Sequence, residues 1–451
     1  MKLKTTTLAC ALALGLVATG SVNAENLSQE QANQLLERLK KLEAEVSALR
    51  GQLEAKEETE KKKPAPVAKT DDAKKAAPSF NWKGAPEIKD SQGWTVKPRG
   101  RALFDAAQLS SVPDSISIPG EGSSSEARRV RLGIQGGMPG GFGYKVEVDF
   151  AGGAELTDAV LTYKHDGWKF TFGQHNNFQS LEELTSSNDS SFIERAAFTD
   201  AFGFERKLGV SAETKFGPVT VQAGLFTDNL EDLDDGNNAL NTDLRAFVSP
   251  KVDGMQLHFG GSFHRRDLGE STDNVRYRAR PMVHSVDTRF INTDRISGAQ
   301  KETSYGFEAA MISGRFHAQA EIHNMNVDRT GFEDPSFFGG AFEVGYFLTS
   351  DTRQYKGGLF KGVKVGQPVS GGGIGAWQVN LRYDRLDLDD AGINGGTQDG
   401  YMASLIWTPI NNVRFLLNYG HLKYSNAFDI VSGAPDDFSV NVLGARTQVS
   451  F

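Results

Sequence analysis

The sequence predicts an all-β fold, a 16-stranded transmembrane antiparallel β-barrel that follows a short N-terminal coiled-coil helix. The mature part of the chain has no apolar run of the roughly 20 residues that a membrane-spanning helix needs, which excludes a helical membrane protein. From about Thr95 onward, apolar and polar residues alternate with the period of two that is typical of strands with one oily and one polar face. The chain ends on an aromatic residue, Phe451, in phase with the apolar face of the last such segment.

Composition fits many strands and turns and limits the chemistry. The chain has 451 residues, of which 39% are hydrophobic, with 49 Gly, 29 Phe and a mean hydropathy of −0.40. These values do not separate a soluble β protein from a membrane barrel. A net charge of −8 gives no support for nucleic-acid binding. The one cysteine, Cys10, lies in the leader described next, so the mature protein is expected to have no disulfide and no thiol chemistry.

Residues 1–24 are predicted to be a signal peptide. Lys2 and Lys4 give a short basic start, an apolar stretch covers residues 8–18, and Val22-Asn23-Ala24 has the small residues of a cleavage site. The chain is therefore expected to be exported.

Residues 25–57 are predicted to form a coiled coil. Apolar residues recur there at alternating spacings of three and four, on one seam of a helix: Leu35, Leu39, Leu42, Val46, Leu49 and Leu53. An alternative is a single amphipathic helix that lies on its own domain. Residues 58–94 begin with Lys, Glu, Ala and Pro, are poor in apolar residues, and are interpreted as a linker.

Residues 95–451 are predicted to form the barrel. Alternating segments cover 95–107, 126–136, 142–151, 155–164, 167–174, 205–216, 218–227, 240–249, 254–264, 302–312, 315–326, 339–349, 374–387, 399–408, 412–424 and 437–451, an even sixteen. Aromatic residues near strand ends, connections that alternate between tight and long, and the terminal Phe451 favour a barrel in lipid over a soluble sandwich. A closed barrel leaves no unpaired edge in lipid.

A barrel of sixteen strands is too wide for side chains to fill, so it should enclose water. Ten cations are predicted to line this pore: Arg99, Arg101, Arg129, Arg131, Lys145, Lys169, Arg245, Arg382, Arg414 and Arg446. Nine acids share their phase: Asp105, Glu147, Asp149, Asp158, Glu213, Glu308, Glu321, Glu343 and Asp384. The wall is nearly balanced, so selectivity must depend on where the charges lie and on loops folded into the lumen.

Three connections are expected to shape the pore. Residues 175–204, which include Glu182, Glu183, Glu194 and Arg195, carry a net negative charge, whereas residues 265–301, with Arg278, Arg280 and Arg289, carry a net positive charge. These two segments are predicted to form the constriction. Residues 350–373 should be a turn by strand count but are too long for one. They are expected to fold into the periplasmic mouth with Lys356, Lys361 and Lys364.

Several motifs, in order along the chain, resemble the phosphate-selective porin O and P family: Arg128-Arg129-Val130-Arg131-Leu132-Gly133, Leu181-Glu182-Glu183-Leu184-Thr185-Ser186-Ser187, Glu194-Arg195, Arg278-Ala279-Arg280-Pro281 and the closing Phe451. The resemblance covers the barrel and, more loosely, the coiled coil. It implies a trimeric outer-membrane channel in which an arginine ladder funnels anions to a constriction. By position, Arg99, Arg101, Arg129 and Arg131 are ladder candidates, with Arg195, Arg278 and Arg280 in the loops.

The predicted function is a water-filled, anion-selective porin for passive uptake of phosphate, polyphosphate or other small anions. The phosphate-selective members of the family have lysines at the constriction. The chain departs from this pattern, because Asn188 and Asp189 follow Ser187 and no lysine occurs between Ser187 and Lys207. A general small-solute porin is the alternative, and a structural anchor that contacts the cell wall through the N-terminal helix is a third hypothesis. No Gly-x-Ser-x-Gly or His-Glu-x-x-His motif supports an enzyme, and no cofactor or metal is assigned.

The predicted location is the outer membrane of a Gram-negative cell, with the N-terminal segment in the periplasm. The expected partners are outer-membrane lipid, two further copies in a homotrimer, and small anionic solutes.

Overall fold

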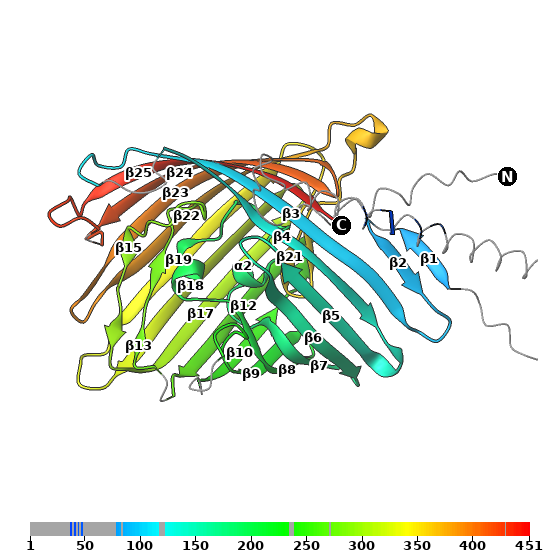
Figure 1. Cartoon of the computed structure of the whole chain (residues 1–451), viewed down its shortest axis with the longest axis horizontal. Helices are drawn as coiled ribbons and strands as arrows, with labels where there is room; N and C mark the ends of the chain where they lie inside the picture. The colour runs from blue at the N-terminus through cyan, green and yellow to red at the C-terminus, as the bar shows by residue number, and fades with distance from the viewer. Residues whose placement is uncertain are drawn as a thin grey trace, which may run out of the picture. The chain divides into compact units, whose positions relative to one another are not determined.

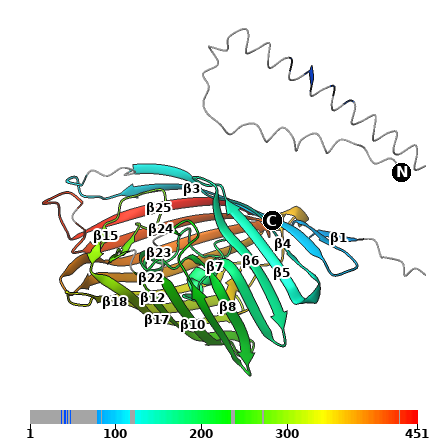
Figure 2. The same cartoon turned by 60° about the horizontal axis from the view of Figure 1, so that its bottom comes forward.

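Sixteen strands form a closed ring in the computed structural model of this chain (Figures 1 and 2). The structure describes residues 37, 40, 41, 44, 47, 78–82, 84–116, 122–233, 239–269, 272–428 and 430–451. Apart from the five single positions, the predicted signal peptide, the coiled coil and residues 58–77 of the predicted linker lie outside the described residues.

The barrel strands are β3 (Thr95–Ser110), β4 (Gly122–Gly137), β5 (Phe142–Asp149), β6 (Glu155–His165), β7 (Trp168–Asn176), β8 (Arg206–Phe216), β9 (Val219–Phe226), β10 (Leu240–Val248), β12 (Met255–Asp267), β17 (Ala299–Ser313), β18 (Phe316–Arg329), β19 (Ser336–Phe347), β22 (Ala376–Asp390), β23 (Ile393–Ile410), β24 (Val413–Ser425) and β25 (Phe438–Ser450). Each pairs antiparallel with the next, and β25 closes the ring on β3 with Ser450 opposite Arg101. The predicted sixteen-stranded antiparallel barrel is confirmed.

The oily face of the wall points outward. On β22, Leu381 is 61% exposed, whereas its neighbour Arg382 is 4% exposed on the inner face. On the adjacent strand, Phe342 is 51% exposed and Glu343 is 2% exposed. A soluble sandwich would have the opposite arrangement, so this wall is built for a surrounding apolar solvent. None of the helices in the described part of the chain is long and apolar enough to cross a membrane.

The two ends of the barrel differ in their connections. Tight turns such as 217–218, 314–315 and 411–412 lie at one end, which we call the tight-turn end. The segments 177–205 and 268–298 leave from the other end, the long-loop end. Strand order places the connection 348–375 at the tight-turn end, as the sequence predicted.

A hairpin replaces the last part of the predicted linker 58–94. Strands β1 (Ser79–Trp82) and β2 (Pro86–Lys89) pair with each other, and β2 continues onto β3 through the pair Ile88 and Val96. The strand β25 ends opposite Gly100, where Phe451 exchanges backbone hydrogen bonds with that glycine. The edge of β3 before Gly100 is therefore open, and β2 fills it. Composition could not reveal this, because each of these strands has only four residues, too few to show a clear alternation.

Part of the barrel interior is packed with protein. The main cluster of buried apolar side chains includes Phe192 and Phe198 from the segment 177–205 and Phe290 and Ile291 from 268–298. The latter segment contains two short ladders, β13 (Asn274–Val275) with β16 (Ile296–Ser297) and β14 (Arg278–Ala279) with β15 (Ile291–Asn292). Both long loops thus fold inward and narrow the lumen. A further short strand, β11 (Lys251–Val252), extends the turn before β12.

Candidate functional site

The segment 177–205, which we call the lumen loop, lies inside the ring of strands with its helix α2 (Leu181–Leu184) (Figure 1). Ser180 caps this helix by accepting a hydrogen bond from the Glu183 backbone N at 3.1 Å. The Glu321 carboxylate of β18 accepts from the backbone N atoms of Leu181 and Glu182 at 2.8 and 2.7 Å. An anion is favourable there because helix N-termini carry unpaired N–H groups and a partial positive charge.

Arg382 on β22 is the centre of the loop's attachment. It pairs with Glu182, and its guanidinium also contacts Glu343 at 3.1 Å. It donates to the carbonyl of Glu194 at 3.1 Å and lies 4.2 Å from the centroid of the Phe192 ring. A buried cation requires several such partners to offset the loss of hydration.

Two more arginines of the wall hold the loop. Arg414 donates to the backbone carbonyls of Asn188 and Ser190. Arg446 makes a bidentate pair with Asp105 at 2.6 Å and reaches Glu194 at 3.1 Å. Arg382, Arg414 and Arg446 do point inward, but the lumen loop covers them, so their prediction as pore-lining residues needs correction. They position the loop.

The loop leaves a cavity of about 1030 Å³ against the wall of β3 to β10. The predicted residues Arg99, Arg101, Arg129, Arg131, Lys145, Lys169 and Arg245 line it. Its charged lining comprises twelve cations, Lys97, Arg99, Arg101, Arg129, Arg131, Lys145, Lys169, Arg195, Arg206, Arg245, Lys356 and Lys361, against four carboxylates, Glu87, Asp158, Glu183 and Glu213. Three carboxylates behind the lining, Glu147, Asp149 and Glu308, pair with Arg99, Arg131 and Arg245. When these three carboxylates are counted as well, cations still outnumber carboxylates by twelve to seven, so the cavity is strongly positive.

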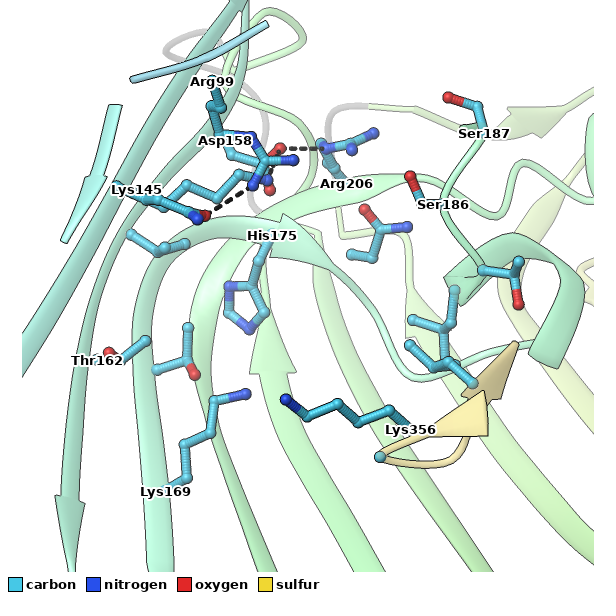
Figure 3. A pocket seen from close by; sticks show the side chains of 18 of the residues that line it. Arg99, Lys145, Asp158, Thr162, Lys169, His175, Ser186, Ser187, Arg206 and Lys356 are labelled. Atoms are coloured by element: carbon cyan, nitrogen blue, oxygen red, sulfur yellow. Dashed lines mark hydrogen bonds and ion pairs between the residues drawn. The ribbon is translucent and has the colours of Figure 1, made fainter. Parts of the chain in front are cut away.

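Ion pairs hold several of these cations in place. Arg99 pairs with Glu147 at 2.9 Å. Asp158 accepts from both Lys145 at 2.8 Å and Arg206 at 3.3 Å, which Figure 3 shows as two dashed lines that meet at one carboxylate. One acid shared by two cations leaves a local excess of positive charge.

Four cations of the lining, Arg129, Lys169, Lys356 and Lys361, have no ion-pair partner within the described residues. The amine ends of Lys169 and Lys356 point toward one another across the cavity in Figure 3. Ser186 and Ser187 of the lumen loop lie on the opposite side from Lys145, and Arg101 donates to the Ser187 hydroxyl at 2.9 Å. Unpaired cations beside hydroxyl donors can bind an oxyanion.

A second cavity of about 750 Å³ opens toward the long-loop end. Five residues line both cavities and so mark the passage between them, which we call the neck: Arg129, Arg131, Glu183, Arg195 and Arg206. Glu183 pairs with Arg195 at 3.2 Å and Arg131 pairs with Asp149 at 2.7 Å. Arg129 remains without a carboxylate partner in the described part of the chain, within the passage that joins the two cavities.

Two inner arginines, Arg128 and Arg206, could not be found from strict alternation. A register shift between Leu103 and Phe104 leaves Arg128 without a ladder partner, and this bulge turns Arg128 inward beside the predicted Arg129. Arg128 then pairs with Glu194 at 2.7 Å. Arg206 is the first residue of β8, and alternation with Ser211, which lines the cavity, would place it on the lipid-facing side. Arg206 nevertheless lines the cavity. A charge at an apparent lipid-facing position is costly, which is the signal that could have identified it.

The connection 348–375 folds into the tight-turn end, as expected. Its ladder of β20 (Gln354–Lys356) and β21 (Leu359–Lys361) is held by Arg245, which donates to the Gly358 carbonyl at 3.2 Å, and by a 2.5 Å hydrogen bond between Tyr355 and His258. Arg353 reaches the lumen loop at the Asp189 carbonyl, at 2.6 Å. Lys356 and Lys361 line the cavity, whereas Lys364 is exposed outside it.

The three arginines predicted for the constriction in 265–301 lie away from the neck. Arg280 lines the second cavity and pairs with Asp287 at 3.1 Å. Arg278 is exposed and lines neither cavity. Burial, together with the nearby Arg280, lowers the pKa of Arg289 to about 10. These residues place positive charge toward the long-loop end, whereas the neck is lined by residues of the lumen loop, β4 and β8.

Three acids of the lumen loop are paired with arginines. Glu182, Glu183 and Glu194 are each bound by arginines, and the Arg128, Arg129 and Arg446 side chains around Glu194 hold its pKa well below the ordinary value despite burial. Glu183 and Glu194 therefore help to hold the segment in place through their arginine pairs.

Glu182 should make loop docking depend on pH. Burial raises its pKa to about 7; the nearby Glu343 and Glu321 add to the rise and Arg382 opposes it. A carboxyl with a raised pKa contributes stability that is complete below its ordinary value of 4.5 and is lost as pH rises through about 7. We expect loop-related current fluctuations in single-channel records to increase as pH rises through about 7, and expect Glu182→Gln to abolish this dependence. An unchanged pH profile in that variant would assign the effect to another group.

Comparison with known proteins places this geometry in a class. A closed barrel with an oily exterior and a loop folded into a charged lumen is an outer-membrane porin, which is a channel protein and not an enzyme. The V. cholerae outer-membrane protein OmpT shares the fold, with a TM-score of 0.50 at 14% identity over 80% of this chain and 99% of that chain.

Residues 99–451 match the phosphate-selective porin O and P family, and the chain belongs to it. An uncharacterised protein of Caulobacter vibrioides is 44% identical over 86% of this chain and 82% of its own length. Porin O of Pseudomonas aeruginosa is 26% identical over 50% of this chain and 56% of its own length.

Proposed function

We propose that the chain forms an anion-selective channel through which inorganic phosphate or other small anions diffuse passively. The observation that carries this proposal is the excess of cations over carboxylates around the cavity, with Arg129 in the neck making no ion pair to any described residue. Fixed charges of one sign in a confined pore concentrate counter-ions, because the low-dielectric walls focus the field.

Phosphate as the solute is supported by the donors on both sides of the path. Arg101 and Arg129 approach from the wall, and the Ser186 and Ser187 hydroxyls approach from the lumen loop. The described part of the lumen loop has no lysine, so Lys169 and Lys356, on other elements, would supply the amines. A general small-solute porin would show no saturation by phosphate. We further propose a homotrimer with its N-terminal segment in the periplasm.

Planar bilayers test the ion preference and the solute separately. Under a potassium chloride gradient, the purified protein should give a zero-current potential of anion sign. A potential of cation sign would contradict the proposal. Phosphate added at constant ionic strength should then reduce the chloride current in a saturable manner if phosphate binds in the pore. An undiminished chloride current would favour the general small-solute alternative.

A further inference from the structure

The β1–β2 hairpin outside the ring carries a continuous apolar face. Phe80 and Trp82 alternate with Ser79 and Asn81 on β1, and the two rings lie 6.4 Å apart between centroids. The pairs Phe80 with Ile88 and Trp82 with Pro86 put all four apolar residues on one face, since directly opposite residues of an antiparallel pair share a face. Phe80 is 66% exposed, Trp82 65% and Ile88 44%.

The orientation of this face is fixed by the barrel. Ile88 is opposite Val96, and Val96 is in phase with Phe104, which is 51% exposed on the oily exterior of β3. On the other face of β2, Glu87 lines the large cavity. The polar side of the hairpin therefore looks toward the pore, and its apolar side continues the lipid-facing surface of the barrel.

The hairpin is also held in position. A Cβ atom added at Gly84 would lie 2.8 Å from the Asn412 side-chain nitrogen, so the turn packs on the tight turn between β23 and β24. Asn412 in turn donates to the Ser450 carbonyl at 2.7 Å. Figure 1 shows β1 and β2 next to the C-terminus at the edge of the ring. The hairpin, with its Phe80 and Trp82 side chains, thus lies at the level of the tight-turn end of the wall.

We propose that the apolar face of the β1–β2 hairpin docks into the lipid of the periplasmic leaflet and anchors the N-terminal side of the channel at that interface. Short turns mark the periplasmic end of such barrels, and aromatic rings are favoured at the boundary between acyl chains and headgroups. The occupant is lipid because the face is continuous with the surface that already contacts lipid. This docking would leave the pore unchanged.

Single labelled cysteines test the occupant. In the chain with Cys10 changed to serine, Phe80→Cys and Trp82→Cys are each labelled with an environment-sensitive fluorophore and folded into phosphatidylcholine vesicles. Asn81→Cys, on the polar face of the same strand, is the matched control, and Phe104→Cys is the lipid-facing reference.

Lipids that carry a nitroxide near the headgroup should quench the labels at positions 80 and 82, whereas iodide in the aqueous phase should not. The label at position 81 should be quenched by iodide and not by these lipids. Quenching by iodide at all three positions would place the face in water and overturn the proposal. Shielding of 80 and 82 from both quenchers would also overturn it, since a second copy of the chain would then cover the face.

Discussion

Changing Arg129 and Arg131 to glutamate should reverse the ion preference of the channel. Both side chains line the neck, and the double change converts two positive charges into two negative ones in the passage between the two cavities. Field focusing in a confined pore changes local ion concentrations by about tenfold or more, so the anion-to-cation permeability ratio should fall by at least about tenfold. The measurement is the zero-current potential in planar bilayers under a salt gradient.

The control keeps the change in charge but moves it away from the pore. Lys251 lies on an exposed tight turn outside both cavities, so Lys251→Glu should leave the potential as in the unmodified protein. If the double variant of the neck keeps its anion preference while its conductance stays normal, Arg129 and Arg131 do not control selectivity. The field would then have to come from the lysines at the tight-turn end.

Arg382→Met should release the lumen loop and widen the pore. The change removes the arginine partner of Glu182 together with a hydrogen bond to the Glu194 carbonyl, and it leaves Glu343 with only the Arg353 ion pair at 3.6 Å. Breaking a buried pair in this way costs about 3–5 kcal/mol. We expect a lower denaturant midpoint in detergent and a larger single-channel conductance with more frequent fluctuations.

Arg385→Met is the matched control on the same strand. Arg385 is 38% exposed at its side chain and pairs with Asp387 and Asp399 at 3.1 Å, and such surface pairs are worth about 0–1 kcal/mol. This variant should keep both the conductance and the denaturant midpoint. Equal conductance in Arg382→Met and Arg385→Met would show that the lumen loop stays docked without Arg382, through Arg414 and Arg446.

Much of the wall could be predicted from the sequence, because alternation is a local property. A period of two puts Leu381 and Arg382 on opposite faces of one strand wherever that strand lies, so each of the sixteen segments can be predicted from its own sequence. Departures from the period cannot be predicted in this way. The bulge at Arg128 and the placement of Arg206 depend on register with the neighbouring strands, and the hairpin β1–β2 depends on where β25 ends.

The sequence by itself determined that the chain makes a barrel with ten inward cations among nearly as many acids. Which charges meet the pore was decided only by the tertiary structure. The lumen loop covers Glu321 and, through Arg382, Glu343 on one wall, while Arg99, Arg129 and their neighbours on the other wall line the cavity. The physical reason is that a charge's effect depends on its solvation and its partner, and both are set by tertiary contacts, such as that of Glu321 with the Leu181 backbone.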